Sequence, residues 1–478
     1  MPALREDLRH DLAALYAFID SITSEIGSKR SFAAYGPAAD SFFEFVSGLA
    51  DRCKDYISGW SVADPEEFED RRGELSTLRA AWQELHVLVK PTLDADTLQA
   101  PLAVVDGLVR RFQEVPACAG TTFAIFHTSD FNYAEVRTTS LRPIIEKFAN
   151  IIPSPPSFPP NLGLIGMPYS QGRTAFANCL VAHEMGHYLY TRLPLQKELK
   201  SRIDSAVQAF PNSEEKKSEY RDVIVQKLTI WAEELFCDLF AVRLAGPCYT
   251  YAYIEAFDLC VILDWDGKLS DDRLLGRLEF YDKYPSHIYR LQQQAIFLRE
   301  SPWWDHISNA RQGKSPSRSA SLLAQVIPIT PELHVKSNPR HGRLISVLDP
   351  VLSHVRETLG KVFNGVDDEF ASFSQLNIHI HNYLAAGIVP STINMRLGVG
   401  KDDTYIAPAS PVVLLNSGMD FYLNHMPDLI TSIPGEDLSS FERRLHWLRR
   451  LEEWIAKALE DQSLEGEAGS VDSGALGN

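Results

Sequence analysis

Residues 180–189 read Leu-Val-Ala-His-Glu-Met-Gly-His-Tyr-Leu, and this stretch decides how the chain is interpreted. In a helix, residues four apart lie on one face, about one turn from each other. The imidazoles of His183 and His187 can therefore reach one cation, at the ~2.0 Å typical of Zn–N bonds. Glu184 is rotated by about 100° from His183 and can face a metal-activated water without binding the metal. The pattern predicts a hydrolytic zinc site with Glu184 as general base.

The motif is specific, because only about 0.03 occurrences of His-Glu-x-x-His are expected by chance in a chain of this length and composition. Its flanks are uncharged, as a buried active-site helix requires: Leu180, Val181, Ala182, Met185, Tyr188 and Leu189. The competing interpretation is an ordinary helix in which the two histidines have a structural role.

A second helix, expected from Ser213 to Leu244, offers the third ligand that a catalytic zinc normally has. Within it, residues 231–238 read Trp-Ala-Glu-Glu-Leu-Phe-Cys-Asp, which places Glu234 and Asp238 on one face. We expect Glu234 to bind the metal and Asp238 to orient an imidazole through its Nδ1–H. Glu233 is expected to be an ordinary exposed acid of this helix.

The sequence HEMGH followed by EELFCD resembles the gluzincin arrangement, in which an HExxH helix is followed by an ExxxD helix. Among gluzincins it most resembles the family of the CAAX prenyl protease and the bacterial heat-shock membrane protease. The first motif of that family is commonly HExGH, and Gly186 matches it. The resemblance implies a zincin-like catalytic domain, a Zn²⁺ cofactor and hydrolysis of peptide bonds.

A third motif of that family is His-Pro with an Arg six residues after the His. Here the segment reads Tyr-Pro-Ser-His-Ile-Tyr-Arg, from Tyr284 to Arg290, so the Pro and the Arg match while Tyr284 replaces the His. Tyr284, His287 and Arg290 are candidates to hydrogen-bond a developing oxyanion. The alternative is that this segment only begins a helix, with Pro285 in the first turn.

The composition limits the classes of partner. The best-known members of the family are embedded in membranes, but no run here approaches the ~20 apolar residues that span a bilayer. The net charge is −17, and duplex-binding proteins usually present a basic face, so no nucleic acid is expected. A local basic run near residues 443–450 is interspersed with acids and predicts a solvated helix face.

The six cysteines lie far apart and form no CxxC pair. We therefore expect neither a thiolate zinc site nor a disulfide framework. Together with a charged N-terminal stretch that lacks the apolar core of a secretory signal, this favours a cytoplasmic location.

The fold expected is α+β and predominantly helical, with a zincin-like catalytic domain flanked by helical regions. The expected parts are a helical N-terminal region at 1–115, the metallopeptidase domain at 116–300, a helical C-terminal region at 301–461 and a disordered tail at 462–478. Residues 121–136 predict strand, turn and strand, and 161–169 a short strand. His379 and His381 would share a face if their segment were a strand, which is a weaker second metal hypothesis.

These features predict a zinc-dependent endopeptidase that acts on a protein or peptide substrate. The helical flanks leave room for a regulatory partner that gates access. One alternative is a catalytically silent zincin-fold binding protein, although a pure scaffold has no need of Glu184. The other is a metal-dependent hydrolase of a non-peptide amide or ester.

Overall fold

The computed structural model describes residues 2–30, 37–60, 65–94, 99–128, 134–136, 138–168, 175–209, 218–264, 266–278, 284–312, 317–329, 339–385, 410–425, 442–443 and 446–459. The chain is predominantly helical, as expected. Its contacts divide it into two units. Unit 1 comprises Met1–Gln99 and Gly120–Gln171, and unit 2 comprises Ala100–Ala119 and Gly172–Asn478. The domain boundaries expected near residues 115 and 300 stay a prediction, and the tail at 462–478 lies outside the described residues.

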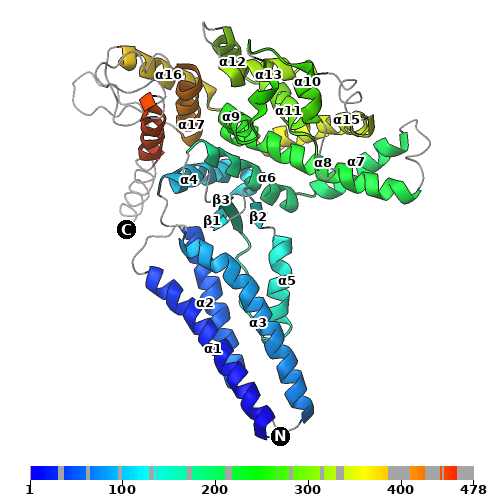
Figure 1. Cartoon of the computed structure of the whole chain (residues 1–478), viewed down its shortest axis with the longest axis vertical. Helices are drawn as coiled ribbons and strands as arrows, with labels where there is room; N and C mark the ends of the chain where they lie inside the picture. The colour runs from blue at the N-terminus through cyan, green and yellow to red at the C-terminus, as the bar shows by residue number, and fades with distance from the viewer. Residues whose placement is uncertain are drawn as a thin grey trace. The chain divides into compact units, whose positions relative to one another are not determined.

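Unit 1 is built from long helices and a small sheet (Figure 1). Its helices are α1 (Pro2–Arg30), α2 (Pro37–Ser58), α3 (Pro65–Asp94) and α5 (Thr138–Ala149). Apolar residues at helical spacing face inward because burial removes their surface from water. On α1 these residues are at most 2% exposed: Leu15, Ile19, Ile22 and Ile26.

The sheet of unit 1 has the strand order β1-β3-β2. Strand β1 (Thr122–Thr128) pairs in parallel with β3 (Leu162–Pro168), and β2 (Ala134–Val136) pairs with β3 in antiparallel. The three expected strands are confirmed. The first two do not pair with each other, because β3 lies between them. As the central strand, β3 is buried along its whole length.

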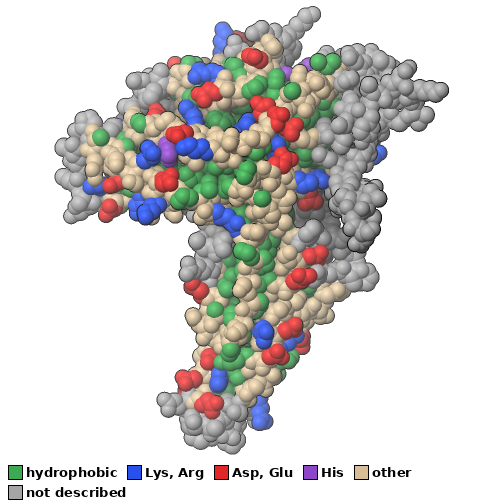
Figure 2. Space-filling model, turned by 180° about the vertical axis from the view of Figure 1, so that it is seen from behind, with side chains coloured by type: hydrophobic (Ala, Val, Ile, Leu, Met, Phe, Trp, Pro, Cys, Tyr) green, Lys and Arg blue, Asp and Glu red, His purple; other side chains and the backbone are tan. Residues whose placement is uncertain are grey.

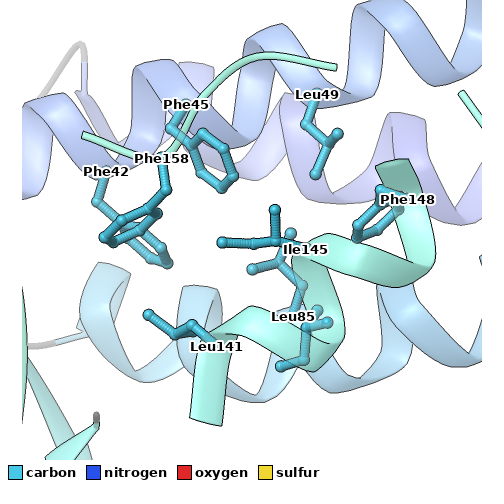
Figure 3. Close-up of a pocket in the computed structure, with 9 residues that line it drawn as sticks. Phe42, Phe45, Leu49, Leu85, Leu141, Ile145, Phe148 and Phe158 are labelled. Atoms are coloured by element: carbon cyan, nitrogen blue, oxygen red, sulfur yellow. The ribbon is translucent and has the colours of Figure 1, made fainter. Parts of the chain in front are cut away.

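The helices of unit 1 meet α5 in an apolar core, shown in Figure 3. A gap of about 10 Å³ remains there. Its walls are entirely apolar: Phe42, Phe45, Leu49, Leu85, Leu141, Ile144, Ile145, Phe148 and Phe158. This volume is at the limit of what one water molecule needs, and no lining group could hold a water, so the gap is a feature of packing.

Unit 2 is helical around a central helix, α8 (Ser218–Ala245), which packs against α6, α7, α11 and α15. Its other helices are α4 (Gln99–Glu114), α6 (Val181–Arg192), α7 (Leu195–Ala209), α9 (Pro247–Ala256), α10 (Asp271–Leu278), α11 (His287–Arg299), α12 (Trp303–Gln312), α13 (Arg318–Val326), α15 (Pro339–Val362), α16 (Phe370–Ala385) and α17 (Pro411–Asp420). Unit 2 also contains short 3-10 turns, η2 (Pro116–Cys118), η3 (Ala177–Leu180) and η4 (Leu259–Ile262), a π-helical turn, η5 (Phe421–His425), and a helical segment at 446–459.

The corner between α8 and α9 is fixed by backbone chemistry and by one side chain. Gly246 has a φ of +71°, a conformation that favours glycine, and Pro247 then begins α9. The side chain of Asn416 accepts a hydrogen bond from the Cys248 N–H and donates one to the Ala245 carbonyl, both at 2.7 Å. The helix stop expected at Gly246-Pro247 is confirmed, and Asn416 holds α9 in place after it.

Residues 379–381 lie within helix α16, as expected for a helical C-terminal region, so the strand on which the second metal hypothesis depended is not formed. Residues two apart in a helix point about 200° apart, so the argument that the two histidines share a face fails.

Two observations bear on the surface and on membranes. Among the described residues, no helix is both long enough and apolar enough to cross a bilayer. On the face shown in Figure 2, acidic and basic side chains are interspersed. In the basic run near residues 443–450, the Nη1 of Arg450 lies 3.4 Å from the carboxylate of Glu453.

Candidate metal centre

Helices α6 and α8 lie close together at Gly186. A Cβ added to Gly186 would lie 2.9 Å from the Cα of Cys237, so only a glycine permits this contact. The close approach brings the HEMGH face of α6 against residues 233–238 of α8. The two motifs that were separate in the sequence therefore meet at one place.

The two imidazoles share the same arrangement of partners. The Nδ1 of His183 lies 3.0 Å from Asp238 Oδ1, and the Nδ1 of His187 lies 2.9 Å from Glu233 Oε1. The two Nε2 atoms face the carboxylate of Glu234, at 3.4 Å from His183 and 3.7 Å from His187. Each ring is thus oriented by one carboxylate and directs its other nitrogen toward a shared point.

This arrangement corrects the expectation for Glu233. Its side chain is not an exposed helix acid, because the residue is only 5% exposed and contacts His187. The placement of Asp238 beside the Nδ1 of His183 agrees with the position expected for it.

Arg290, from α11, connects the carboxylates. Its Nε and Nη2 donate to the two oxygens of Asp238, each at 2.7 Å, and its Nη1 lies 3.0 Å from Glu234 Oε2. The hydroxyl of Tyr249, from α9, donates to Asp238 Oδ1 at 2.6 Å. Arg290 was expected as a candidate for the oxyanion, but in this structure its guanidinium is engaged by carboxylates.

The buried charges shift one another's pKa values. Burial lowers the pKa of His183, but hydrogen bonds to Asp238 and Glu234 outweigh this and raise it to about 10. Burial raises the pKa of Glu234, but Arg290 and His183 outweigh this and lower it to about 2. Asp238 is likewise held well below its usual pKa, against the effect of its burial, chiefly by Arg290. Both carboxylates are therefore ionised at neutral pH.

Cys237 is a ligand candidate that the sequence interpretation missed. Its sulfur and one ring nitrogen each from His183 and His187 all lie within 4.8 Å of one another. The buried group His183–His187–Cys237 could therefore hold a metal ion, which is contrary to the expectation of no thiolate ligand. Burial raises the pKa of this thiol, and four nearby carboxylates raise it further: Glu234, Glu233, Asp238 and Glu184.

Glu184, the expected base, is 8% exposed on α6. Its charge is one of those that raise the pKa of Cys237, on the facing helix α8. The other cysteines form no disulfide, although the sulfurs of Cys179 and Cys248 are 3.0 Å apart.

The remaining candidates occupy different positions. Tyr284 is 37% exposed and lies just before Ser286, the N-cap of α11, whose side chain accepts from the Tyr289 N–H. His287 is partly buried. Its Nδ1 lies 2.7 Å from the Tyr253 hydroxyl, and its ring stacks on Phe257. The segment does begin a helix, as the alternative interpretation stated, but Pro285 precedes the N-cap and is not in the first turn.

Tyr249 was also missed from the sequence, although a signal existed. It lies in the first turn of α9, directly after the helix stop at Gly246-Pro247, and α9 packs against α8. Glu233 and Cys237 are four residues apart, as are Glu234 and Asp238, so each pair shares a face of the helix. This spacing was the signal for Glu233 and Cys237.

No protein-family model, curated protein or solved structure matches this chain.

Proposed function

We propose that this protein is a zinc-dependent peptidase whose metal is held by His183, His187 and Glu234. The observation that supports this most directly is the convergence of both Nε2 atoms on Glu234, while both Nδ1 atoms are held by other carboxylates. In metal sites a ligating histidine usually donates its second N–H to a carboxylate, which fixes the ring and its tautomer. Here both histidines have such a carboxylate partner and face the same point. A purely structural contact between two helices does not require this arrangement.

The donor set fits zinc. Two imidazole nitrogens and one carboxylate are the ligands of many hydrolytic zinc sites, which keep a fourth position open. Cys237 competes with Glu234 for the third position. We favour Glu234 because its carboxylate faces both Nε2 atoms, whereas Cys237 lies where the α8 backbone presses on Gly186.

When bound, zinc would supply Lewis acidity and lower the pKa of a water toward neutrality. Glu184 would take the proton from that water and later deliver it to the leaving amine. Arg290 keeps Glu234 and Asp238 ionised and fixed in place, so it acts as a positioning residue. His287 and Tyr284 remain candidates for binding the oxyanion. The pairing of an HExxH helix with an ExxxD helix supports a zincin-like catalytic domain of the gluzincin type.

The test is the metal content of the purified full chain, measured by elemental analysis after zinc addition and removal of excess. We expect about one zinc per chain, lost in His183→Ala and in His187→Ala. Glu234→Ala should lose most of the metal and Cys237→Ser should retain it. A wild-type chain without bound divalent metal would overturn the proposal. If Cys237→Ser lost its zinc while Glu234→Ala retained it, the third metal ligand would be Cys237 and not Glu234.

A further inference from the structure

Helix α11 forms one wall of a pocket. The residues of α11 that line it lie on a different face of the helix from Arg290. The pocket has a volume of about 310 Å³ and lies between α11, residues 327–329 and α15. This volume is at the lower end of the range for small-molecule sites, which are mostly apolar with a few polar groups placed among them. None of its lining residues belongs to the metal centre.

The apolar part of the wall is aliphatic. It is formed by Ile296, Ile327, Ile329, Ile345 and Leu352. The segment 327–329 is held by Gln292, whose side-chain amide donates to the carbonyls of Ile327 and Ile329 at 3.2 and 2.6 Å. Three elements thus support an aliphatic surface that would contact the apolar body of a ligand.

The polar part of the wall contains one cation, Arg356. Its Nη2 donates to Gln293 Oε1 at 2.9 Å. Within the described part of the chain, no carboxylate lies within ion-pair distance of this guanidinium. Its Nε is buried without a hydrogen-bond partner, so a ligand would meet the Nη groups. A guanidinium presents paired N–H groups that match a carboxylate.

The pocket is also lined by one acid, Asp349, whose negative charge would repel a bound anion. Its Oδ1 accepts a hydrogen bond from the Tyr289 hydroxyl at 2.6 Å. Burial raises the pKa of this carboxyl, while the Tyr289 hydrogen bond and the charge of Arg356 lower it. A doubly charged phosphate would need more donors than one arginine and would be repelled more strongly. A singly charged carboxylate is the better match.

We propose that this pocket binds a small aliphatic carboxylic acid, with its carboxylate on Arg356 and its hydrocarbon body against the isoleucines. The proposal does not depend on the metal centre or on the proposed peptidase activity. The ligand chemistry follows from one available guanidinium beside an aliphatic wall of limited volume.

The test is isothermal titration of the full chain with 4-methylpentanoate and with octanoate. Each acid is compared with its uncharged amide, which keeps the apolar body and removes the charge. We expect the acids to bind and the amides to bind at least about tenfold more weakly. Arg356→Gln should remove that preference. Arg343→Gln, which removes an exposed arginine from the same helix, should leave it unchanged.

Equal binding of acid and amide would overturn the proposal, as would no heat of binding up to about 10 mM acid. If Arg356→Gln does not fold, as judged by circular dichroism, Ile296→Trp provides the second measurement. Ile296 is only partly buried, so a larger side chain can enter the pocket from its rim. Acid binding that persists in folded Ile296→Trp would place the ligand elsewhere and would also overturn the proposal.

Discussion

The Nδ1 of His187 lies 2.9 Å from the carboxylate of Glu233, and this contact gives the second imidazole the same kind of partner as the first. His183 has its partner in Asp238, five residues further along α8. The two carboxylates lie on either side of Glu234, which faces the Nε2 atoms. Helix α8 therefore supplies both the orienting groups and the candidate ligand from little more than one turn.

Because of this contact, we expect replacement of Glu233 to weaken zinc binding. Glu233→Ala should weaken zinc binding by about 10–100-fold, because the His187 ring loses the group that fixes its orientation. The measurement is zinc affinity by competition with a chelating dye. Asp222→Ala removes an exposed acid from the same helix and should have no effect. Equal zinc affinity in Glu233→Ala and in the wild type would show that the contact does not support the metal.

Glu184→Gln should separate metal binding from turnover. The amide has nearly the same shape but cannot take a proton from water, and general-base catalysis is typically worth ~10²–10⁴-fold. We expect unchanged zinc content and a loss of that size in the cleavage of a mixed peptide library, followed by mass spectrometry. Cleavage at the wild-type rate would contradict the role given to Glu184.

Gly186→Ala should disturb the crossing of α6 and α8. The added methyl would lie 2.9 Å from the backbone of Cys237, so the helices must shift apart. We expect a loss of about 1–3 kcal/mol in the free energy of unfolding and weaker zinc binding. The matched control is Gly360→Ala on α15, where nothing lies within 4 Å of the new Cβ. That change should be neutral or stabilising by up to about 1 kcal/mol, and similar losses in both variants would contradict the explanation.

Glu452 should make the stability of the protein depend on pH. Burial raises the pKa of this side chain to about 7, against smaller lowering effects of the Ala175 backbone and Arg449. Between the unfolded value of about 4.5 and pH 7, the folded state binds the proton and the unfolded state does not. Stability therefore falls as pH rises through this window, and the penalty stays constant above it.

Glu452→Gln should remove that penalty. Because Glu452 is only partly buried, we expect the variant to be more stable than the wild type by about 1–2 kcal/mol at pH 8, with no difference below pH 4.5. Urea unfolding at several pH values measures this. The exposed neighbour Glu453 provides the control variant Glu453→Gln, which should show no such pH dependence. A difference that is the same at every pH would rule out titration of Glu452 as its cause.

The sequence by itself was sufficient where the signal is local. The helix that carries HEMGH, the stop at Gly246-Pro247 and the short strands were predicted from spacing, from breakers and from β-branched and aromatic residues. Such features depend on neighbours within a turn or a strand. At 379–381 the alternation was too short to support a strand, and the segment is helical, as expected for the C-terminal region.

The tertiary structure alone decided which side chains of α8 meet the histidines. Residues 231–242 of this helix are buried on every side, so no polar stripe indicates the face that turns toward α6. The sequence therefore offered Glu234 but left Glu233 outside the site and gave Cys237 no part. Arg290 could be proposed as a candidate from the sequence, but its carboxylate partners depend on how α11 packs against α8. The contacts of a fully buried helix are set by the elements around it, and their positions are not encoded in its own periodicity.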